Sequence, residues 1–389
     1  MRKLLSSSAN RQKLTLSTRQ THVVWQFGVL LAVLGLLGFL LSNLLHNLEA
    51  RNIASGFGFL HREAGFAIGE SVIHYQPSDS YGRAIAAGLL NTIRVALIAI
   101  IGATVLGVLL GLSRLSQNGL LRLLSASYIE LIRNTPLLLQ LFFWYALITE
   151  AMPPARAALN PLPSVYISNR GLKLPGLQAE SLGGLLMGLG LALLVWVVFW
   201  HLQRQRRTNV LHKKPLWLFL LVFPLAGAWL GGASFSLNLP QLKTFNFVGG
   251  VSISPEFTAL LVGLVVYSAA FVAEVVRAGI ESVSAGQWDA ARALGLSNTT
   301  VLRKVVFPQA QRLVIPPITS QYLNITKNSS LAVAIGYPDI VSVANTTLNR
   351  TGQAVEGILI IMAAYLLLSL VISVLMNLYN RRLALPGYA

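Results

Sequence analysis

The sequence predicts an all-α, polytopic membrane protein that crosses the bilayer about eight times. Hydrophobic residues make up 54% of the 389 residues and charged residues only 11%, and the mean hydropathy is +0.63. The apolar residues gather in runs instead of alternating with polar ones, which favours membrane-spanning helices. A helix needs about 20 apolar residues to cross the hydrocarbon core. Segments of about that length lie at residues 24–44, 86–112, 121–148, 182–201, 216–234, 257–280, 313–337 and 355–379.

The first apolar run is expected to be an additional anchoring helix, at residues 23–45. The run is longer than the roughly 7–15 residues of a signal-peptide core, and no clear small-x-small cleavage site follows it. We therefore expect this helix to be retained.

Basic residues between the runs predict the orientation, because Lys and Arg concentrate on the cytoplasmic side. The tail 1–22, the loop 202–215 and the tail 381–389 contain basic residues and no acid, whereas the segment 46–85 is nearly balanced in charge. We expect 46–85 to be a periplasmic loop and both termini to be cytoplasmic. The net charge of +17 then reflects topology and contact with the lipid membrane, and no nucleic acid is expected as a partner.

Composition and motifs exclude most kinds of chemistry. The sequence contains no cysteine, so it forms no disulfide or thiolate metal site, and its six histidines lack metal-ligand spacing. It also lacks the GxxxxGK[ST] phosphate loop and the residue constellations of a membrane enzyme. We expect a chain that is not an enzyme, with no catalytic residue, no metal and no bound cofactor.

A charged stretch between two apolar segments is the most informative motif. The small side chains of Ala290, Ala291 and Ala293 give a narrow face that can enter a groove in a partner, and Trp288 is a candidate aromatic anchor. The predicted topology places this stretch in the cytoplasm. It reads Gln287-Trp288-Asp289-Ala290-Ala291-Arg292-Ala293-Leu294-Gly295, and Val305-Val306-Phe307-Pro308 follows after nine residues.

Local signals predict a helix–turn–helix in this stretch. Ser284 or Gly286 can begin a first helix, and Gly295 is suited to the left-handed C′ position that ends it. Ser297 is a good N-cap for a second helix, over the residues up to 306, which Pro308 is expected to stop. The two helices would lie along the membrane surface.

The motif resembles the EAA loop of ABC importer permeases. Three further elements resemble those of polar amino acid permeases, the histidine/glutamine/arginine group, and follow that family's order: Tyr128–Phe143, Ala270–Ile280 and Lys327–Leu331. The resemblance extends over about residues 85–380, and the likeness is greatest to the permeases of general L-amino acid transport systems.

This resemblance implies the transmembrane domain of a type I importer in a bacterial inner membrane. Its core would lie in residues 86–148, with two helices, and 257–380, with three helices and the coupling loop 285–308. An ABC ATPase subunit, which alone would bind ATP and Mg²⁺, would dock on that loop. The resemblance also implies a second permease chain, expected to be related but different, and a periplasmic binding protein that delivers L-amino acids of broad specificity. The implied docking residues are Gln287, Trp288, Asp289, Ala290, Ala291, Arg292, Ala293, Gly295 and Pro308.

An insertion at residues 149–256 departs from the five-helix core of that family. It contains two of the apolar runs, and its outer segment is rich in Pro and Gly, which predicts a periplasmic loop. The loop is either a packing element or a docking surface.

Polar residues inside the expected spans are candidates for a substrate pathway, because charges are costly in a bilayer. Lys327 is expected near the middle of the membrane, on a helix that Ile315–Pro317 can break. We hypothesise that Lys327, with Ser330, binds the α-carboxylate of an amino acid; alternatively, it pairs with another helix and holds the fold. The candidates for the pathway are Lys327, Asn324, Asn328, Ser329, Ser330, Thr135 and Gln140.

Two pairs of opposite charges are expected to be structural and to lie beside a gate. Glu130 and Arg133 are three residues apart, as are Glu274 and Arg277, so each pair can neutralise itself on one helix.

The alternative function is that of a secondary amino acid transporter not coupled to an ATPase. Such a transporter commonly has inverted repeats and midplane carboxylates, and the sequence shows neither. The function we expect is therefore an ATP-driven permease subunit that moves L-amino acids from periplasm to cytoplasm.

Overall fold

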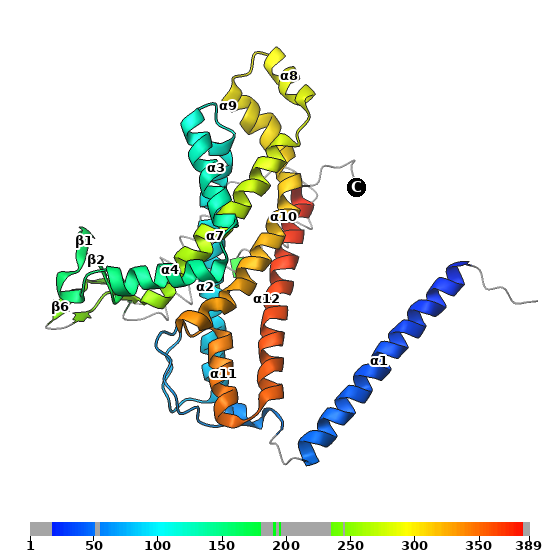
Figure 1. Ribbon diagram of the computed structural model, residues 1–389, viewed down its shortest axis with the longest axis vertical. Helices are drawn as coiled ribbons and strands as arrows, with labels where there is room; N and C mark the ends of the chain where they lie inside the picture. Colours follow the sequence, from blue (N-terminus) through cyan, green and yellow to red (C-terminus); the bar gives the residue numbers. More distant parts are fainter. Residues whose placement is uncertain are drawn as a thin grey trace, which may run out of the picture.

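A helical bundle forms the centre of the structure (Figure 1). The computed structural model describes residues 18–50, 55–179, 190–191, 194–195, 235–243 and 246–383. The expected spans 182–201 and 216–234 therefore lie outside the described residues, apart from four positions in the first. The main helices are α2 (Tyr81–Arg114), α7 (Pro255–Glu281), α10 (Phe307–Asn328) and α12 (Ala354–Leu383).

The pairing of α2 with α7 is the centre of the core. A Cβ atom at Gly107 would lie 2.6 Å from Cβ of Val272, so only glycine lets the two helices approach this closely. Nearer the start of α7, Leu141, Leu260 and Leu264 are fully buried in the main apolar cluster. Side chains of this size contribute about 1.5–3 kcal/mol each when buried from water.

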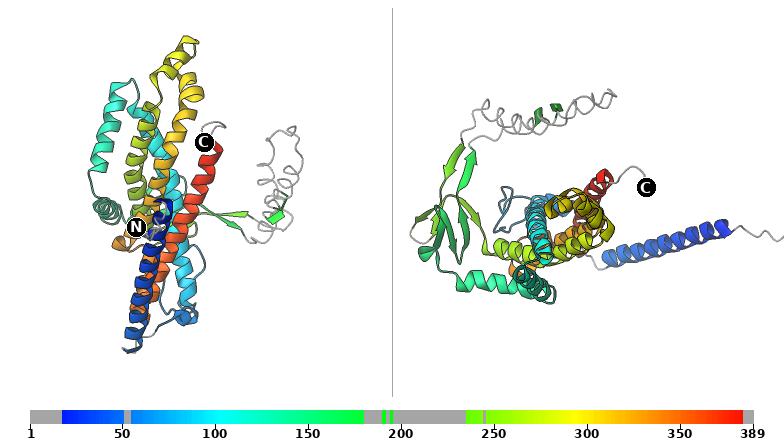
Figure 2. Two further views of the ribbon diagram at one scale, coloured as in Figure 1. Left: turned by 90° about the vertical axis from the view of Figure 1, so that its right-hand side faces the viewer. Right: turned by 90° about the horizontal axis from the view of Figure 1, so that it is seen from above.

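The described residues confirm fewer spans than the eight expected. Three helices, α2, α7 and α12, are long and apolar enough to cross a membrane, or up to five spans if each of two bent helix pairs counts as one. Helix α1 (Thr18–Ala50), which covers the expected anchor, contains a shorter apolar stretch, Trp25–Leu40. It lies apart from the bundle (Figures 1 and 2).

The expected span 121–148 is instead two helices with a bend of 103° between them. Helix α3 (Gly119–Arg133) ends before Pro136, and α4 (Leu137–Ala146) begins after it, continuing into a π turn, η2 (Leu147–Ala151). Proline disfavours helical backbone in the preceding residue, so a continuous apolar run here changes direction. In Figure 1, α4 lies almost at right angles to the bundle.

The expected span 313–337 is divided as well, but not where the prolines predicted. Pro316 and Pro317 lie inside α10, which packs against both α7 and α12; packing of this kind lets a membrane helix tolerate proline. The regular helix ends instead at Asn328, where the 3-10 helix η5 (Ser329–Ile335) begins. Helix α11 (Ile340–Thr351) follows at an angle of 53°.

The Pro- and Gly-rich part of the insertion forms short antiparallel strands, where the sequence predicted only a loop. One sheet has the order β1-β2-β3-β8, and β4-β5 and β6-β7 form two further pairs (Figure 2). β3 contacts α7, which β8 directly precedes. The strands are β1 (Leu159–Leu162), β2 (Val165–Ser168), β3 (Gly171–Leu174), β4 (Gly176–Ala179), β5 (Phe235–Asn238), β6 (Gln241–Lys243), β7 (Asn246–Val248) and β8 (Val251–Ile253).

The segment before α2 is folded back on the bundle. It contains the 3-10 helix η1 (Phe57–His61) and buries Phe59 and Phe66 with Tyr81 and Val343. Ser80 then begins α2 by accepting a hydrogen bond from the backbone N–H of Arg83. The segment 55–80 is thereby fixed to α2 and α11 at the end of the bundle opposite α8.

Candidate functional site

The coupling segment, residues 285–308, lies at the tip of the bundle (Figure 1). Its first helix is α8 (Ala285–Ala293), and Gly295 follows with φ of 73°, the left-handed position predicted for it. The N–H of Leu296 donates to the carbonyl of Ala291, and the N–H of Gly295 donates to that of Arg292. These two bonds form a Schellman motif, which ends the helix firmly.

The predicted docking residues of α8 lie on two sides of the helix. Ala291 is buried, and the half-buried Trp288 packs with it against an apolar cluster of the bundle; a role of Trp288 as an anchor for a partner stays a prediction. The exposed side presents Gln287, Asp289, Ala290, Arg292 and Ala293 together with Leu294, which is 79% exposed. The sequence analysis missed Leu294, although an apolar residue directly before the C′ glycine was a usable signal.

The second helix of the coupling segment is not stopped by Pro308. Helix α9 (Asn298–Val301) passes through a π turn, η4 (Leu302–Val306), directly into α10. In the π turn, the N–H of Phe307 donates to the carbonyl of Leu302, so Pro308 falls in the first turn after a shift in the hydrogen-bond ladder, where its missing N–H does little harm. The side-chain amide of Gln309 donates to the carbonyl of Val305. The second helix of the coupling segment and α10 are therefore one continuous helical element.

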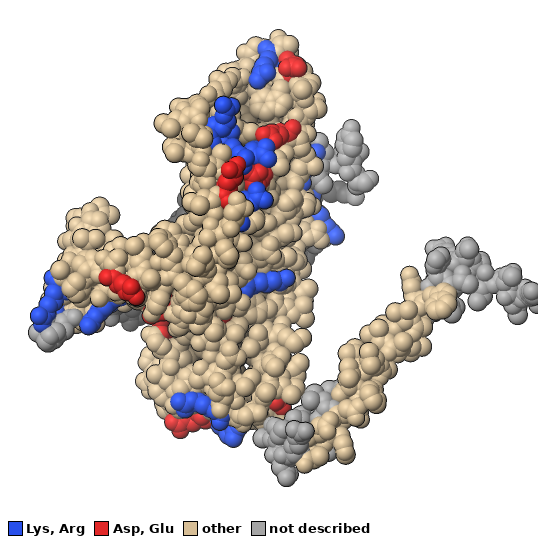
Figure 3. Space-filling view, viewed as in Figure 1, with Lys and Arg blue, Asp and Glu red and all other residues tan. Residues whose placement is uncertain are grey.

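Charged side chains gather near the coupling segment, at the upper end of the bundle in Figure 3. Glu274 is paired with both Arg114 and Arg277, and Arg277 also contacts Glu281 at 2.5 Å. The predicted Glu274–Arg277 pair is thus confirmed and belongs to a larger network that joins α2 to α7.

The other predicted pair is wrong. Glu130 and Arg133 form no ion pair in the described structure; the guanidinium of Arg133 instead lies over the ring of Phe271, 5.3 Å from its centroid. Both charges are exposed, and an exposed pair is worth too little to hold this geometry.

Thr135 and Gln140 lie at the bend between α3 and α4. The side-chain amide of Gln140 donates to the carbonyls of Ile132 and Thr135, while its own carbonyl oxygen is buried without a partner. The hydroxyl of Thr135 donates to the carbonyl of Leu131. Both side chains satisfy backbone groups that the bend leaves free, and their role in a pathway stays a prediction.

The polar end of α10 is divided between an exposed and a buried side. Lys327 and Asn324 are exposed, whereas Ser329 is buried and donates to the carbonyl of Thr326. Ser330 donates to the carbonyl of Lys327, so its hydroxyl is already engaged on its own helix. Lys327 forms no ion pair among the described residues, and Asn328 is half-buried.

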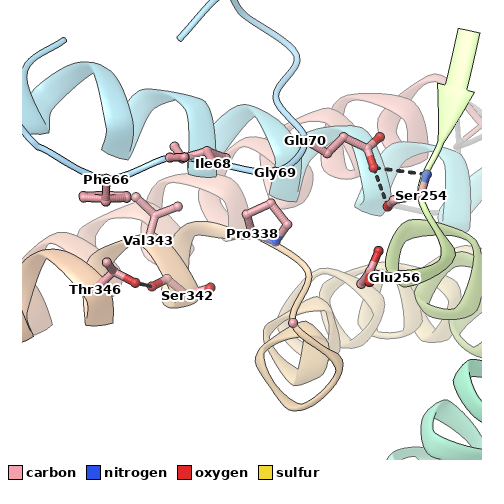
Figure 4. Close-up of a pocket in the computed structure, with 12 residues that line it drawn as sticks. Phe66, Ile68, Gly69, Glu70, Ser254, Glu256, Pro338, Ser342, Val343 and Thr346 are labelled. Atoms are coloured by element: carbon pink, nitrogen blue, oxygen red, sulfur yellow. Dashed lines mark hydrogen bonds between the residues drawn. The ribbon is translucent and has the colours of Figure 1, made fainter. Parts of the chain in front are cut away.

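A second polar cluster was missed by the sequence analysis (Figure 4). A carboxylate oxygen of Glu70 lies 2.6 Å from a guanidinium nitrogen of Arg94, and the other accepts a hydrogen bond of 2.5 Å from the hydroxyl of Ser254. The amide of Asn91 donates to the backbone carbonyls of Glu70 and Pro338. Arg94, a cation inside the expected span 86–112, was the signal for this cluster.

Comparisons with known proteins agree with this architecture. Residues 103–385 match the family described as binding-protein-dependent transport system inner membrane component. The chain is 48% identical over 369 residues to the putative amino-acid ABC transporter permease protein YhdX of Escherichia coli, covering 93% of this chain and 94% of that relative. It is 41% identical over 371 residues to the general L-amino acid transport system permease protein AapQ of Rhizobium johnstonii, covering 93% and 92%.

The crystal structure of an amino acid ABC transporter with histidines aligns with a TM-score of 0.47 at 24% identity and covers 78% of this chain and 95% of that one. Because the family match extends over most of the sequence and the two relatives match over nearly their whole lengths, this chain belongs to the family of inner membrane components of binding-protein-dependent transport systems.

Proposed function

We propose that this chain is the permease subunit of an ATP-driven importer that moves L-amino acids, with broad specificity, from periplasm to cytoplasm. The observation that carries the proposal is the exposed, firmly capped helix α8, which presents Leu294 at the charged tip of the bundle. Both relatives reported above are named as permeases for amino acids. The sequence has no phosphate loop of its own, so ATP and Mg²⁺ would bind to a partner ATPase.

The contacts of the coupling segment support a route by which movement of an ATPase would reach the pathway. Ala291 of α8 and Val301 and Val306 of the following turns share one buried cluster with Val276 of α7 and Ala310 of α10. Close-packed clusters transmit displacement instead of absorbing it. An ATPase that moves α8 would therefore move the ends of α7 and α10 with it.

The exposed side of α10 is the proposed wall of the substrate pathway. Leu313, Pro317, Ser320, Asn324 and Lys327 recur at helical spacing and are all exposed. We assign this side to a second permease chain across the pathway, with Lys327 binding the α-carboxylate of the substrate. The Glu274 network would close the pathway on the cytoplasmic side.

The remaining partners follow from the family and its relatives. A periplasmic binding protein would deliver the amino acid, and a related but different permease would complete the pair. Two distinct chains of Escherichia coli, GltJ and GltK, are both named glutamate/aspartate import permease protein, which supports a pair of unlike chains. The location would be the bacterial inner membrane with both termini in the cytoplasm.

Affinity purification of the tagged chain from its native membrane tests the proposal. We expect an ATPase subunit and a second permease to copurify, and an amino-acid-loaded binding protein to stimulate ATP hydrolysis by the complex. A chain that purifies without an ATPase and still moves amino acids in vesicles would instead be a secondary transporter.

A further inference from the structure

A cavity of about 380 Å³ opens at the end of the bundle opposite α8. Its walls come from the segment 66–70, the start of α7 and the region from Gly336 to the first turns of α11 (Figure 4). A volume of this order is typical of sites for small molecules. The cavity is separate from the exposed side of α10 that carries Lys327, which is not among its lining residues.

The charge in this cavity is one-sided. Two of its lining residues, Glu70 and Glu256, are acids, and none is a base. Glu70 is neutralised by Arg94. Glu256, by contrast, forms no ion pair in the described structure and accepts only a long hydrogen bond, 3.3 Å, from the hydroxyl of Tyr145. One full negative charge is therefore left without a counterion.

An excess of acidic over basic side chains around the cavity is unusual for this chain. The sequence has 30 basic residues and only 13 acids, so a cavity lined by two acids and no base runs against the overall composition. The other polar lining side chains, Ser254, Ser342 and Thr346, are hydroxyls, which can accept hydrogen bonds as well as donate them. The cavity thus offers acceptors and a negative charge, which suit a ligand with N–H donors and a positive charge.

We propose that this cavity is a binding site for a primary ammonium group, with Glu256 as its counterion. The carboxylate of Glu256 contacts the ammonium, and the Glu70–Arg94 pair fixes the wall on the same side of the cavity (Figure 4). Ser342 and Thr346 line the other side of the cavity. The assignment of the ammonium group to a transported amino acid rests on the proposed function. The preference of the cavity for a cation is independent of that function.

The absence of cysteine from the sequence allows a direct test that requires no transport. A single cysteine is introduced as Ser342→Cys in the purified complex, and its labelling rates by 2-aminoethyl methanethiosulfonate, a cation, and 2-sulfonatoethyl methanethiosulfonate, an anion, are compared. Rates at Ser236→Cys, exposed in β5 and outside the cavity, correct for the intrinsic reactivities. After correction, the cationic reagent is expected to react about tenfold faster, because one unscreened charge nearby changes the local concentration of an ion by this order.

Charge variants assign the effect to one residue. Glu256→Gln is expected to bring the corrected ratio of rates close to one, whereas Glu150→Gln, an exposed acid outside the cavity, leaves it unchanged. A corrected ratio near one in the Ser342→Cys protein, or a ratio that Glu256→Gln does not lower, would overturn the proposal. If Ser342→Cys prevents assembly of the complex, Thr346→Cys on the same wall gives the same measurement.

Protection by small molecules then identifies the source of the ammonium. n-Butylammonium is expected to slow labelling, and n-butanol is not. Protection by L-alanine as well as L-lysine assigns the site to the α-ammonium group, and protection by L-lysine alone assigns it to a side-chain cation. Equal effects of n-butylammonium and n-butanol would contradict a site for cations. Labelling does not depend on an ATPase, so a failure of the proposed import function would leave this result intact.

Discussion

The carboxylate of Glu70 lies 2.6 Å from the guanidinium of Arg94 and joins the segment before the bundle to the interior of α2. Its second oxygen accepts from Ser254, the N-cap of α7. One side chain thus connects three parts of the chain that are far apart in sequence. This contact holds the wall of the cavity and the start of α7 in a fixed relation.

We expect neutralisation of Glu70 in the Glu70–Arg94 pair to lower the stability of the protein by a measurable amount. Glu70→Gln leaves Arg94 without its counterion in a largely buried position, which costs about 1.5–3 kcal/mol. We expect a lower midpoint of thermal unfolding for the purified complex. Arg94→Gln in the same chain should recover part of the loss, which a double-mutant cycle measures. Glu63→Gln, an exposed acid of the same segment, is the control, and an equal effect from it would count against the pair.

We expect the coupling segment to require the left-handed backbone conformation of Gly295. Its φ is 73°, and no atom lies within 4 Å of the position of an added Cβ, so substitution strains the backbone without a clash. Gly295→Ala should cost about 1 kcal/mol and weaken stimulation of the ATPase by the loaded binding protein. Gly295→Asn should retain more stimulation, because Asn tolerates this conformation.

Gly286 supplies the matched control for that experiment. It also has open space around it, but it lies inside α8 and its φ is not positive. Gly286→Ala should therefore favour the helix, by about 0.5–1 kcal/mol. If Gly295→Ala behaved like Gly286→Ala, the Schellman motif would have no part in coupling.

We expect the side chain of Leu294 to make an apolar contact with the ATPase. Because its side chain is 79% exposed, Leu294→Ser should leave the stability of the chain unchanged but remove about 1.5–3 kcal/mol of burial on docking. We expect the ATPase to dissociate at least tenfold more readily, measured by the amount retained during copurification. Leu131→Ser, on α3 and 70% exposed, is the control. Equal retention in the two variants would remove Leu294 from the interface.

Local signals predicted both ends of the first helix of the coupling segment and the start of the second, since glycine and N-cap preferences act within a few residues. They wrongly ended the second helix at Pro308. Tertiary features were harder to predict. The apolar run 121–148 is continuous in hydropathy, which records length but not direction, so the 103° bend at Pro136 was missed. Glu70 and Arg94 are separated in sequence and were assigned to different regions, a loop and a span. The strands of the insertion lie in a segment rich in Pro and Gly, and these residues favour turns and loops. The sequence therefore predicted a loop there.

We expect removal of the Lys327 side chain to weaken substrate binding without preventing assembly of the complex. Its side chain is exposed and has no ion pair among the described residues, so Lys327→Ala should leave the thermal stability of the complex unchanged. If the lysine binds the α-carboxylate, half-maximal transport should need at least tenfold more amino acid. Lys304→Ala, an exposed cation in the π turn, is the control. Unchanged affinity in a normally assembled Lys327→Ala complex would refute the hypothesis, and lost assembly would favour the structural alternative.

We expect the buried Lys173 to make the stability of the sheet β1-β2-β3-β8 in the insertion depend on pH. It is buried in β3, where its Nζ donates to the hydroxyl of Ser252, and its pKa is lowered from 10.5 by burial and then by the charge of Arg170. Between the lowered pKa and 10.5, the unfolded chain binds more protons than the folded one, so stability rises with pH in that interval. Below the lowered pKa, the whole cost of the buried ammonium is present.

Replacing this lysine by an uncharged side chain should therefore stabilise the sheet most at neutral pH. Lys173→Met removes the cost of burying a charge, so chymotrypsin should cleave near Tyr166 more slowly in the variant than in the wild type at pH 7. The ratio of the two rates, which cancels the pH dependence of the protease, should approach one as the pH rises toward 10.5, because the wild-type lysine then loses its proton too. Lys243→Met, in exposed β6, should give a ratio near one throughout. A Lys173→Met ratio that does not vary with pH would show that the buried charge does not limit the stability of this sheet.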